Sequence, residues 1–321
     1  MSKINFHQIF LFAMMLATAT FAGGWCHGQS VDQKSETEQT QSQKTVAKKS
    51  GSHDRFLRVR VDRKGRPVAM ETSIVRYQKM DADGQLITVD LIGAVHVGEG
   101  QYYKDLNKQF EKYDALLYEL VAPEGSVVPK GGRDKGKALG NPIGAMQVGM
   151  QSVLELKFQL DLIDYTKKNF VHADMSPTEF AQSMKKNEES VAGYALKAIG
   201  SSMAMQQAGK DTGSAGMLMA MFSKNKALRL RRVMAKQMID MDAGLAMFKG
   251  KDGSTIVNHR NAKCMKILSR EIAAGKKDLG IFYGAAHLAD MEKRLINDFD
   301  MQPGGQKWVP AWKLTKREFV K

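Results

Sequence analysis

Two segments of the sequence place a histidine directly after an apolar run. The first ends in Gly93–His96 and the second in Gly284–His287, and each contains a glycine, two small or apolar residues and the histidine. Glu119 ends a third apolar run. A carboxylate beside two imidazoles serves either as the third ligand of a catalytic metal or as a general base. We therefore predict that these three side chains form one reactive centre.

His96, His287 and Glu119 each have a structural interpretation as well. A lone histidine beside a strand is more often a satisfied structural residue, and a polar residue at a strand end is unremarkable. The repetition of one turn after two strands favours a functional role for both histidines. The position of Glu119 after a neighbouring strand strengthens that hypothesis.

The elements that must position His96 and Glu119 form a predicted β-α-β unit. Residues 86–93 are an apolar run of strand length, residues 99–113 have helical spacing, and residues 115–118 are typical of a short buried strand. Such a unit pairs its strands in parallel through a right-handed crossover, so both strands end at one edge of the sheet. Sites of open α/β sheets lie at that edge.

The arrangement of an apolar strand followed by a Gly-x-x-His turn recurs near the end of the chain. A helix is predicted over about 254–274, followed by a strand over 279–283 that stops just before His287. The remaining elements carry no candidate catalytic residue: a hairpin with strands at 56–61 and 68–78, a helix at about 288–299, and a strand at 308–314 that Pro310 assigns to a sheet edge.

The middle of the chain, about 143–250, has helical periodicity, Gly and Ser breaks and no convincing strand. One helix is predicted to begin at Pro177, with Ser176 as its N-cap and Glu179 completing a capping box. The segment is rich in Met, which favours adaptable core packing first, a pliable groove for an apolar or peptide ligand second, and soft-metal binding third. We expect a helical, Met-rich insert or cap lobe.

These elements predict an α/β fold with a mixed central sheet and flanking helices, in a domain over residues 54–321. Residues 1–28 have the layout of a secretory signal peptide, with a lysine, an apolar run and then small residues. Residues 29–53 are almost free of large apolar side chains and predict a disordered tether. The protein is therefore expected to be secreted, periplasmic or associated with the cell envelope, with an uncleaved anchor as the alternative.

Three stretches match the pattern of a known family: Ile92–Val97 with Tyr102–Tyr103 behind it, Tyr113–Glu119, and Tyr283–Leu288. They resemble the two Gly-x-x-His motifs and the strand-end glutamate of the TraB/GumN superfamily, which includes the Tiki-type metalloproteases. That superfamily is related in fold to the erythromycin-esterase and ChaN-like proteins. The matches keep the family's order and span nearly all of the predicted domain. Ala94 departs from the family's usual small hydroxyl residue and leaves the three ligand positions unchanged.

Arg260 and Asn261, on the helix before the last core strand, are similar to the family's Arg-Asn pair. The resemblance implies a metal-dependent hydrolase, in some members a peptidase using manganese or cobalt, with His96, Glu119 and His287 around the metal. Other members have no assigned activity. Arg260 and Asn261 would then orient a ligand carboxylate or stabilise an oxyanion. The residues alone favour a surface ion pair for Arg260 and a loop-capping role for Asn261.

Two further groups need an interpretation. His172 and Asp174 lie just before the helix at Ser176, where Asp174 either supports the cap or, with His172, contacts a substrate or a ligating histidine. Cys264 falls within an amphipathic helical pattern, which favours a core thiol over a nucleophile.

The formal net charge of +14 raises the question of nucleic-acid binding. The Lys and Arg residues are scattered over the tether, a Gly-rich loop at 130–137 and a helix near 229–232, without interleaved aromatic residues that would stack on bases. We therefore predict no nucleic-acid partner. Attraction to an anionic wall or membrane surface is one interpretation of the charge, and a solvated basic surface without a partner is the other.

Three functional hypotheses follow. The first is a hydrolase of peptide or amide bonds, acting on a peptide or small-molecule substrate with a divalent Mn, Co or Zn ion held by His96, Glu119 and His287. The second is a metal-independent esterase-type hydrolase with His96 or Glu119 as general base. The third is a non-catalytic protein that binds haem, a metal or a peptide in the same cleft.

Overall fold

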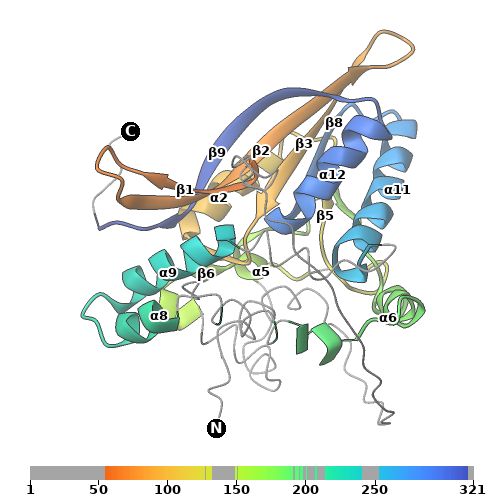
Figure 1. Ribbon diagram of the computed structural model, residues 1–321. Helices are drawn as coiled ribbons and strands as arrows, with labels where there is room; N and C mark the ends of the chain where they lie inside the picture. Colours follow the sequence, from red (N-terminus) through yellow and green to blue (C-terminus); the bar gives the residue numbers. More distant parts are fainter. Residues whose placement is uncertain are drawn as a thin grey trace, which may run out of the picture.

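The architecture is seen in a computed structural model of the chain (Figure 1). It describes residues 55–126, 128–131, 149, 151–190, 192–194, 196–197, 200, 207, 214–240 and 253–316. The predicted signal peptide (1–28) and tether (29–53) lie outside the described residues, as do Arg133, Lys135, Lys137, Met203, Met205, Met241 and Met247. Among the described helices, none is long and apolar enough to cross a bilayer.

A seven-stranded mixed sheet forms the centre, in the order β1-β2-β3-β8-β5-β7, with β9 on the other edge of β2. The four strands β3, β8, β5 and β7 are parallel, whereas β1, β3 and β9 are all antiparallel to β2. Their bounds are β1 Leu57–Val61, β2 Pro67–Met80, β3 Leu86–Ala94, β5 Ala115–Tyr118, β7 Phe170–His172, β8 Asp278–Gly284 and β9 Gln302–Lys313.

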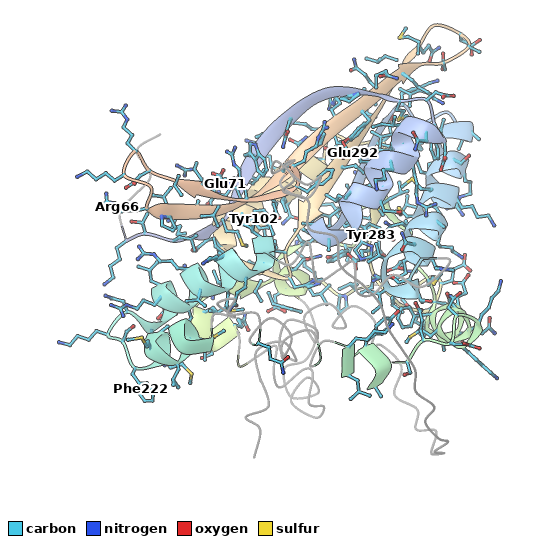
Figure 2. The ribbon with its side chains drawn as sticks, viewed as in Figure 1. Arg66, Glu71, Tyr102, Phe222, Tyr283 and Glu292 are labelled. Atoms are coloured by element: carbon cyan, nitrogen blue, oxygen red, sulfur yellow. The ribbon has the colours of Figure 1, made fainter. Side chains whose placement is uncertain are left out.

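Both faces of β3, β5 and β8 are buried, which explains their continuous apolar sequences. Leu116 and Phe282 belong to the core on one side, with residues of α2 (Gly100–Phe110), while Leu117 and Ile281 belong to the core on the other side. That second side is covered by α11 (Arg260–Ala273) and α12 (Ala285–Asn297), which lie together on one face in Figure 1. Figure 2 shows Tyr102 and Tyr283 inside these layers and Arg66 projecting from the β1–β2 turn.

The mixed sheet, the opening hairpin and the β3-α2-β5 unit confirm the predicted elements. β9 pairs with β2 alone among the described strands, in agreement with the edge position expected from Pro310. The expected pairing of residues 86–93 with residues 115–118 is wrong, because β3 and β5 are parallel but β8, from later in the chain, lies between them and pairs with both. His96 and Glu119 therefore flank a strand that delivers His287.

The expectation that the middle of the chain contains no strand is wrong. β6 (Lys157–Phe158) pairs with β4 (Val97–Gly98), and β7 extends the main sheet. These strands have two or three residues, too few for an alternating pattern to emerge. The described helices of this part are α5 Gln159–Leu162, α6 Pro177–Lys186, α8 Ser214–Met221 and α9 Lys226–Asp240.

The capping box at α6 is confirmed. The amide of Glu179 donates to Ser176 Oγ at 3.2 Å, and the amide of Ser176 donates to Glu179 Oε2 at 2.8 Å. These two bonds satisfy amides that a helix start otherwise leaves without partners.

The two Gly-x-x-His turns differ in backbone structure, contrary to the expectation that they repeat one device. His96 lies in a bend between β3 and β4, whereas α12 begins at Ala285, so His287 lies in its first turn with Gly284 as N-cap. The helix predicted from 254 also divides, into the π-helix η2 (Thr255–His259) and α11. Arg260 is the first residue after this π turn, a feature often found at functional sites.

Candidate functional site

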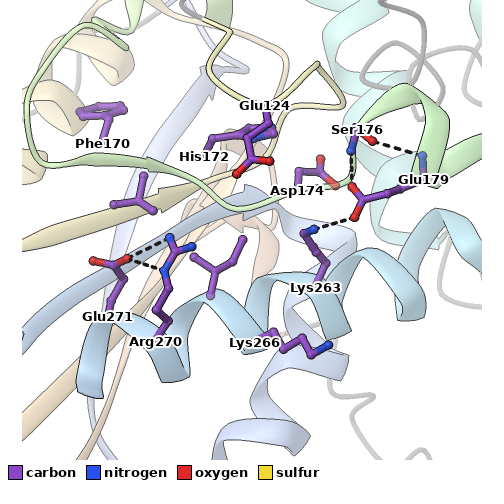
Figure 3. Close-up of a pocket in the computed structure, with 12 residues that line it drawn as sticks. Glu124, Phe170, His172, Asp174, Ser176, Glu179, Lys263, Lys266, Arg270 and Glu271 are labelled. Carbon is purple, nitrogen blue, oxygen red and sulfur yellow. Dashed lines mark hydrogen bonds and ion pairs between the residues drawn. The ribbon is translucent and has the colours of Figure 1, made fainter. Parts of the chain in front are cut away.

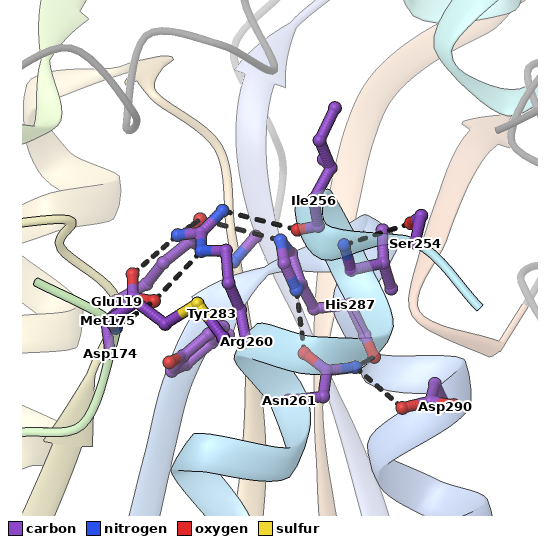
Figure 4. A network of polar contacts seen from close by, with 12 residues as sticks. Glu119, Asp174, Met175, Ser254, Ile256, Arg260, Asn261, Tyr283, His287 and Asp290 are labelled. Atoms are coloured by element: carbon purple, nitrogen blue, oxygen red, sulfur yellow. Dashed lines mark hydrogen bonds and ion pairs between the residues drawn. The ribbon is translucent and has the colours of Figure 1, made fainter. Parts of the chain in front are cut away.

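Four polar side chains meet at the carboxyl edge of the parallel strands, and Figure 4 shows Glu119, Asp174 and His287 among them. His96 follows β3, His287 follows β8, Glu119 follows β5, and Asp174 follows β7. Parallel strands deliver their carboxyl ends to one side of a sheet, so residues far apart in sequence come together there. Arg260 joins them from the start of α11.

Glu119 is a buried carboxylate with a donor on each oxygen. Arg260 Nη2 donates to Oε1 at 2.7 Å, and the amide of Gly284 donates to Oε2 at 2.7 Å from the start of α12. Burial by itself would raise the pKa of Glu119, but the charge of Arg260, followed by His287 and His96, lowers it well below its ordinary value. Glu119 is therefore an anion at neutral pH.

Arg260 links two carboxylates inside the protein. Its guanidinium donates to Asp174 through Nε at 2.9 Å and Nη2 at 2.5 Å, besides its bond to Glu119, and the residue is 1% exposed. Burial would lower the pKa of Arg260, but the two carboxylates raise it further above its ordinary value, so the cation is permanent. Its ion pairs are deeply buried, which contradicts the surface ion pair that the residues alone favoured. The observed contacts therefore show that Arg260 positions Glu119, and they do not support the role of orienting a ligand.

The imidazole of His287 is fixed through its Nδ1 atom, which lies 2.7 Å from Asn261 Oδ1. Because an amide oxygen only accepts, Nδ1 donates and the neutral ring keeps its lone pair on Nε2. Nε2 lies 3.5 Å from Glu119 Oε1. Burial lowers the pKa of His287 to about 4, with a smaller opposing effect of Glu119, so this ring is neutral at pH 7.

Asn261 is fully buried and has no hydrogen left for a ligand. Its Nδ2 donates to the carbonyl of His287 at 3.0 Å and to Asp290 Oδ2 at 2.9 Å. Asp290 is itself held by Asn258 at 2.9 Å and Arg294 at 2.7 Å. Asn261 thus orients His287 and is neither the oxyanion donor nor the loop cap that the sequence suggested.

His96 lies on a turn that two tyrosines of α2 anchor. Tyr102 donates to the carbonyl of Gly93 and Tyr103 to that of Val95, both at 2.8 Å. Burial of the His96 ring lowers its pKa, with a further contribution from Arg260, while Glu119 opposes this shift.

Gln159 is one residue of this centre that the sequence did not indicate. Its amide nitrogen donates to Tyr165 at 2.8 Å, its backbone amide donates to the carbonyl of His96 at 2.8 Å, and its side chain interacts with the His96 ring. The short β4–β6 ladder brings it there, and no local pattern marks such a ladder. Asp290 was also missed, although its position three residues after His287 on one helix face was a usable signal.

The predicted pair of His172 and Asp174 is divided by the structure. Asp174 belongs to the polar centre through Arg260. His172 Nε2 lies 2.6 Å from the carbonyl of Leu120, and the residue lines a separate groove of about 890 Å³ between β7 and α11 (Figure 3). Asp174 lines this groove as well and so forms the wall between it and Arg260. Opposite β7, the groove is bordered by Lys263, Lys266 and Arg270 of α11.

Cys264 is the core thiol that its helical pattern indicated. It is fully buried, and burial raises its pKa well above the ordinary thiol value, which removes the thiolate needed for nucleophilic attack.

The arrangement combines an ionised carboxylate, two imidazoles and a fixed cation. It can take up a proton at His287 Nε2, and the two imidazoles and Glu119 offer the ligand types of a catalytic divalent-metal site. Over the described residues, no group of three or more His, Cys, Asp or Glu side chains has the arrangement needed to hold a metal ion.

Comparison with protein families, with curated proteins and with solved structures gave no match to this chain.

Proposed function

We propose that this protein is a metal-dependent hydrolase whose divalent ion is held by His96, Glu119 and His287. The observation that carries the proposal is the state of His287. Its Nδ1 is fixed by Asn261, which leaves a bare lone pair on Nε2, 3.5 Å from an ionised carboxylate oxygen. Metal-ligating histidines characteristically donate their other ring N–H to an oxygen acceptor, which here is Asn261 Oδ1.

The protonation states of the three groups fit this role. Metal binding requires neutral imidazoles and an ionised carboxylate. Burial lowers the pKa values of His96 and His287, and Arg260 with the two histidines keeps the pKa of Glu119 low against the effect of burial. All three groups are therefore ready to bind a cation at neutral pH without losing protons first.

The remaining residues position these ligands. Asn261 sets the ring orientation of His287, and Asp290 sets the orientation of the Asn261 amide. Arg260 holds Glu119 and is itself held by Asp174. A divalent ion such as Mn, Co or Zn would supply Lewis acidity toward water and a substrate carbonyl.

Peptide or amide bonds are the proposed substrate class, on the basis of the resemblance to the TraB/GumN superfamily. The groove between β7 and α11 has the size of a ligand site, and His172 is its candidate substrate contact, whereas the buried Asp174 carboxylate is taken up by Arg260. The proposal includes the fold details that go with this family, a helical Met-rich cap lobe over the erythromycin-esterase or ChaN-like core, and a location outside the cytoplasm.

The test is metal binding followed by hydrolysis. The purified protein is analysed for Mn, Co and Zn, and the metal-free protein is titrated with each ion by calorimetry. We expect one ion per chain, lost in His96→Ala and Glu119→Gln and retained in His172→Ala, the matched control outside the centre. Turnover of a peptide panel should stop with a chelator and return with the ion. Absence of binding for all three ions would overturn the proposal.

A specific observation supports a second candidate, a metal-independent esterase-type hydrolase. Arg260 already pairs with Glu119 at 2.7 Å, so this carboxylate has a cationic partner without an ion, and His287 Nε2 is available as a general base. Chelator-resistant ester turnover that His287→Ala abolishes would support it. A copurifying ligand together with a silent ester and peptide panel would instead favour a non-catalytic binding protein.

A further inference from the structure

Helices α8 (Ser214–Met221) and α9 (Lys226–Asp240) form a hairpin, the α8–α9 hairpin, with a short turn between them. One side of it is firmly held. Leu230, Met234 and Ala220 are buried in the core that also contains the residues of α2. Arg231 Nη1 donates to Glu99 at 2.7 Å, and Arg232 Nε donates to the carbonyl of Leu314 at 2.7 Å. The hairpin is therefore attached to the body through its own core and polar contacts.

The free end of the hairpin is apolar and exposed. Leu218 is 60% exposed, Met219 70%, Met221 56% and Phe222 84%, and we call these four residues the apolar tip. Figure 2 shows Phe222 projecting outward from the end of the hairpin. Single exposed apolar residues are ordinary, but four within five positions of one element indicate an interaction surface.

A basic band follows the apolar tip, from the turn after it along α9. The hairpin, residues 214–240, contains six Lys or Arg residues and a single acidic residue, Asp240, at the end of α9 far from the tip. Five of the six are exposed: Lys224, Lys226, Arg229, Arg232 and Lys236.

We propose that the apolar tip inserts into the surface of an anionic lipid bilayer, with the basic band on the lipid headgroups. An apolar patch flanked by basic residues is the composition that binds membrane interfaces, where the apolar side chains enter the acyl boundary and the cations remain at headgroup level. A second copy of the chain is disfavoured as the occupant, because it would bring a second uncompensated basic band to the same contact. Nucleic acid would leave the apolar side chains without a partner. This inference is independent of the proposed hydrolase activity.

The experiment is vesicle co-sedimentation of the full chain with neutral phosphatidylcholine vesicles and with vesicles containing phosphatidylglycerol. Met219→Ser/Phe222→Ser removes the most exposed part of the tip, and Lys224→Gln/Lys226→Gln removes two charges. Matched controls lie at distant sites: Met80→Ser/Leu86→Ser, which are also apolar and exposed, at 60% and 48%, and Arg63→Gln/Lys64→Gln on the β1–β2 turn. All variants keep the same N-terminal residues, so that segment contributes equally to each.

We expect the wild type to prefer anionic vesicles and to lose that preference in high salt. The tip variant should bind at least about tenfold more weakly. The charge variant should lose about fivefold for each charge on anionic vesicles only. The two control variants should bind like the wild type.

Equal binding by wild type, tip variant and charge variant would overturn the proposal. A tip variant that changes self-association in sedimentation velocity while leaving vesicle binding intact would also overturn it, in favour of a second copy. Thermal unfolding monitors the fold of each variant, and the charge variant keeps the test valid if the tip variant unfolds.

Discussion

The polar centre and the α8–α9 hairpin both depart from the rule that charged residues are exposed and apolar residues are buried. At the sheet edge, Glu119, Asp174 and Arg260 are charged and almost fully buried, while at the hairpin Met219 and Phe222 are apolar and mostly exposed. Burying an unpaired charge is costly, so the centre persists only because each charge has a partner. Exposed apolar area carries no comparable local cost and only lacks the stabilisation that burial gives. The comparison therefore predicts large effects of substitution in the centre and small ones at the tip.

The largest effect is expected for Arg260→Met. This change leaves two buried carboxylates facing each other without a cation, a loss on the order of 3–5 kcal/mol in the free energy of unfolding. Urea denaturation at pH 7 measures it. The control is Arg270→Met on the same helix, whose exposed ion pair with Glu271 should contribute less than about 1 kcal/mol. Equal losses in both variants would contradict the comparison.

Asn261→Ala is expected to weaken metal affinity by about 10–100-fold, because it frees the ring of His287. Calorimetric titration of the metal-free protein measures the change. Asn258→Ala is the matched control, since Asn258 also bonds Asp290 but does not touch His287. If both variants bind the ion like the wild type, the orienting role assigned to Asn261 is wrong.

The buried neutral state of His287 predicts a dependence of stability on pH. Burial lowers the pKa of His287 to about 4, whereas the pKa of a histidine in an unfolded chain is about 6.5. The unfolded chain therefore binds an extra proton between these values, so stability is lost as the pH falls below about 6.5 and levels off below the folded pKa. Between pH 7 and 5 the loss is about 2 kcal/mol.

Denaturation curves of wild type and His287→Asn at pH 7 and pH 5 isolate this contribution. The variant should lack the part of the slope that belongs to His287, although other histidines contribute equally to both proteins. Parallel losses in wild type and variant would show that this ring is not held neutral.

The smallest effect is expected for Phe222→Ser, which should change the free energy of unfolding by less than about 0.5 kcal/mol. Its side chain is 84% exposed and buries little area in the folded chain. Leu230→Ala on the buried side of the same hairpin should cost about 2–5 kcal/mol. A large loss for Phe222→Ser would mean that the tip packs within this chain and would weaken the case for an external partner.

Strands β1, β2, β3, β5, β8 and β9 and the capping box at Ser176 were predictable because they depend on neighbouring residues. Continuous apolar runs of strand length marked β3, β5 and β8. These runs are continuous because both faces of each strand are covered and must therefore be apolar. The same runs indicated that His96, Glu119 and His287 follow strand ends. These features are local in sequence, so periodicity and turn residues are enough to determine them.

The tertiary structure alone decided which of these residues meet and what each one does. The strand order places β8 between β3 and β5, and that pairing joins positions nearly 200 residues apart, as in Ala94 with Gly284. The two-residue ladder that brings Gln159 to His96 has no sequence pattern. Arg260 and Asn261 were recognised as a pair, but their roles depend on which atoms their partners leave free. The sequence by itself determined the local elements and the candidate residues, whereas long-range pairing and the competition for hydrogen-bond partners in the core decided the site.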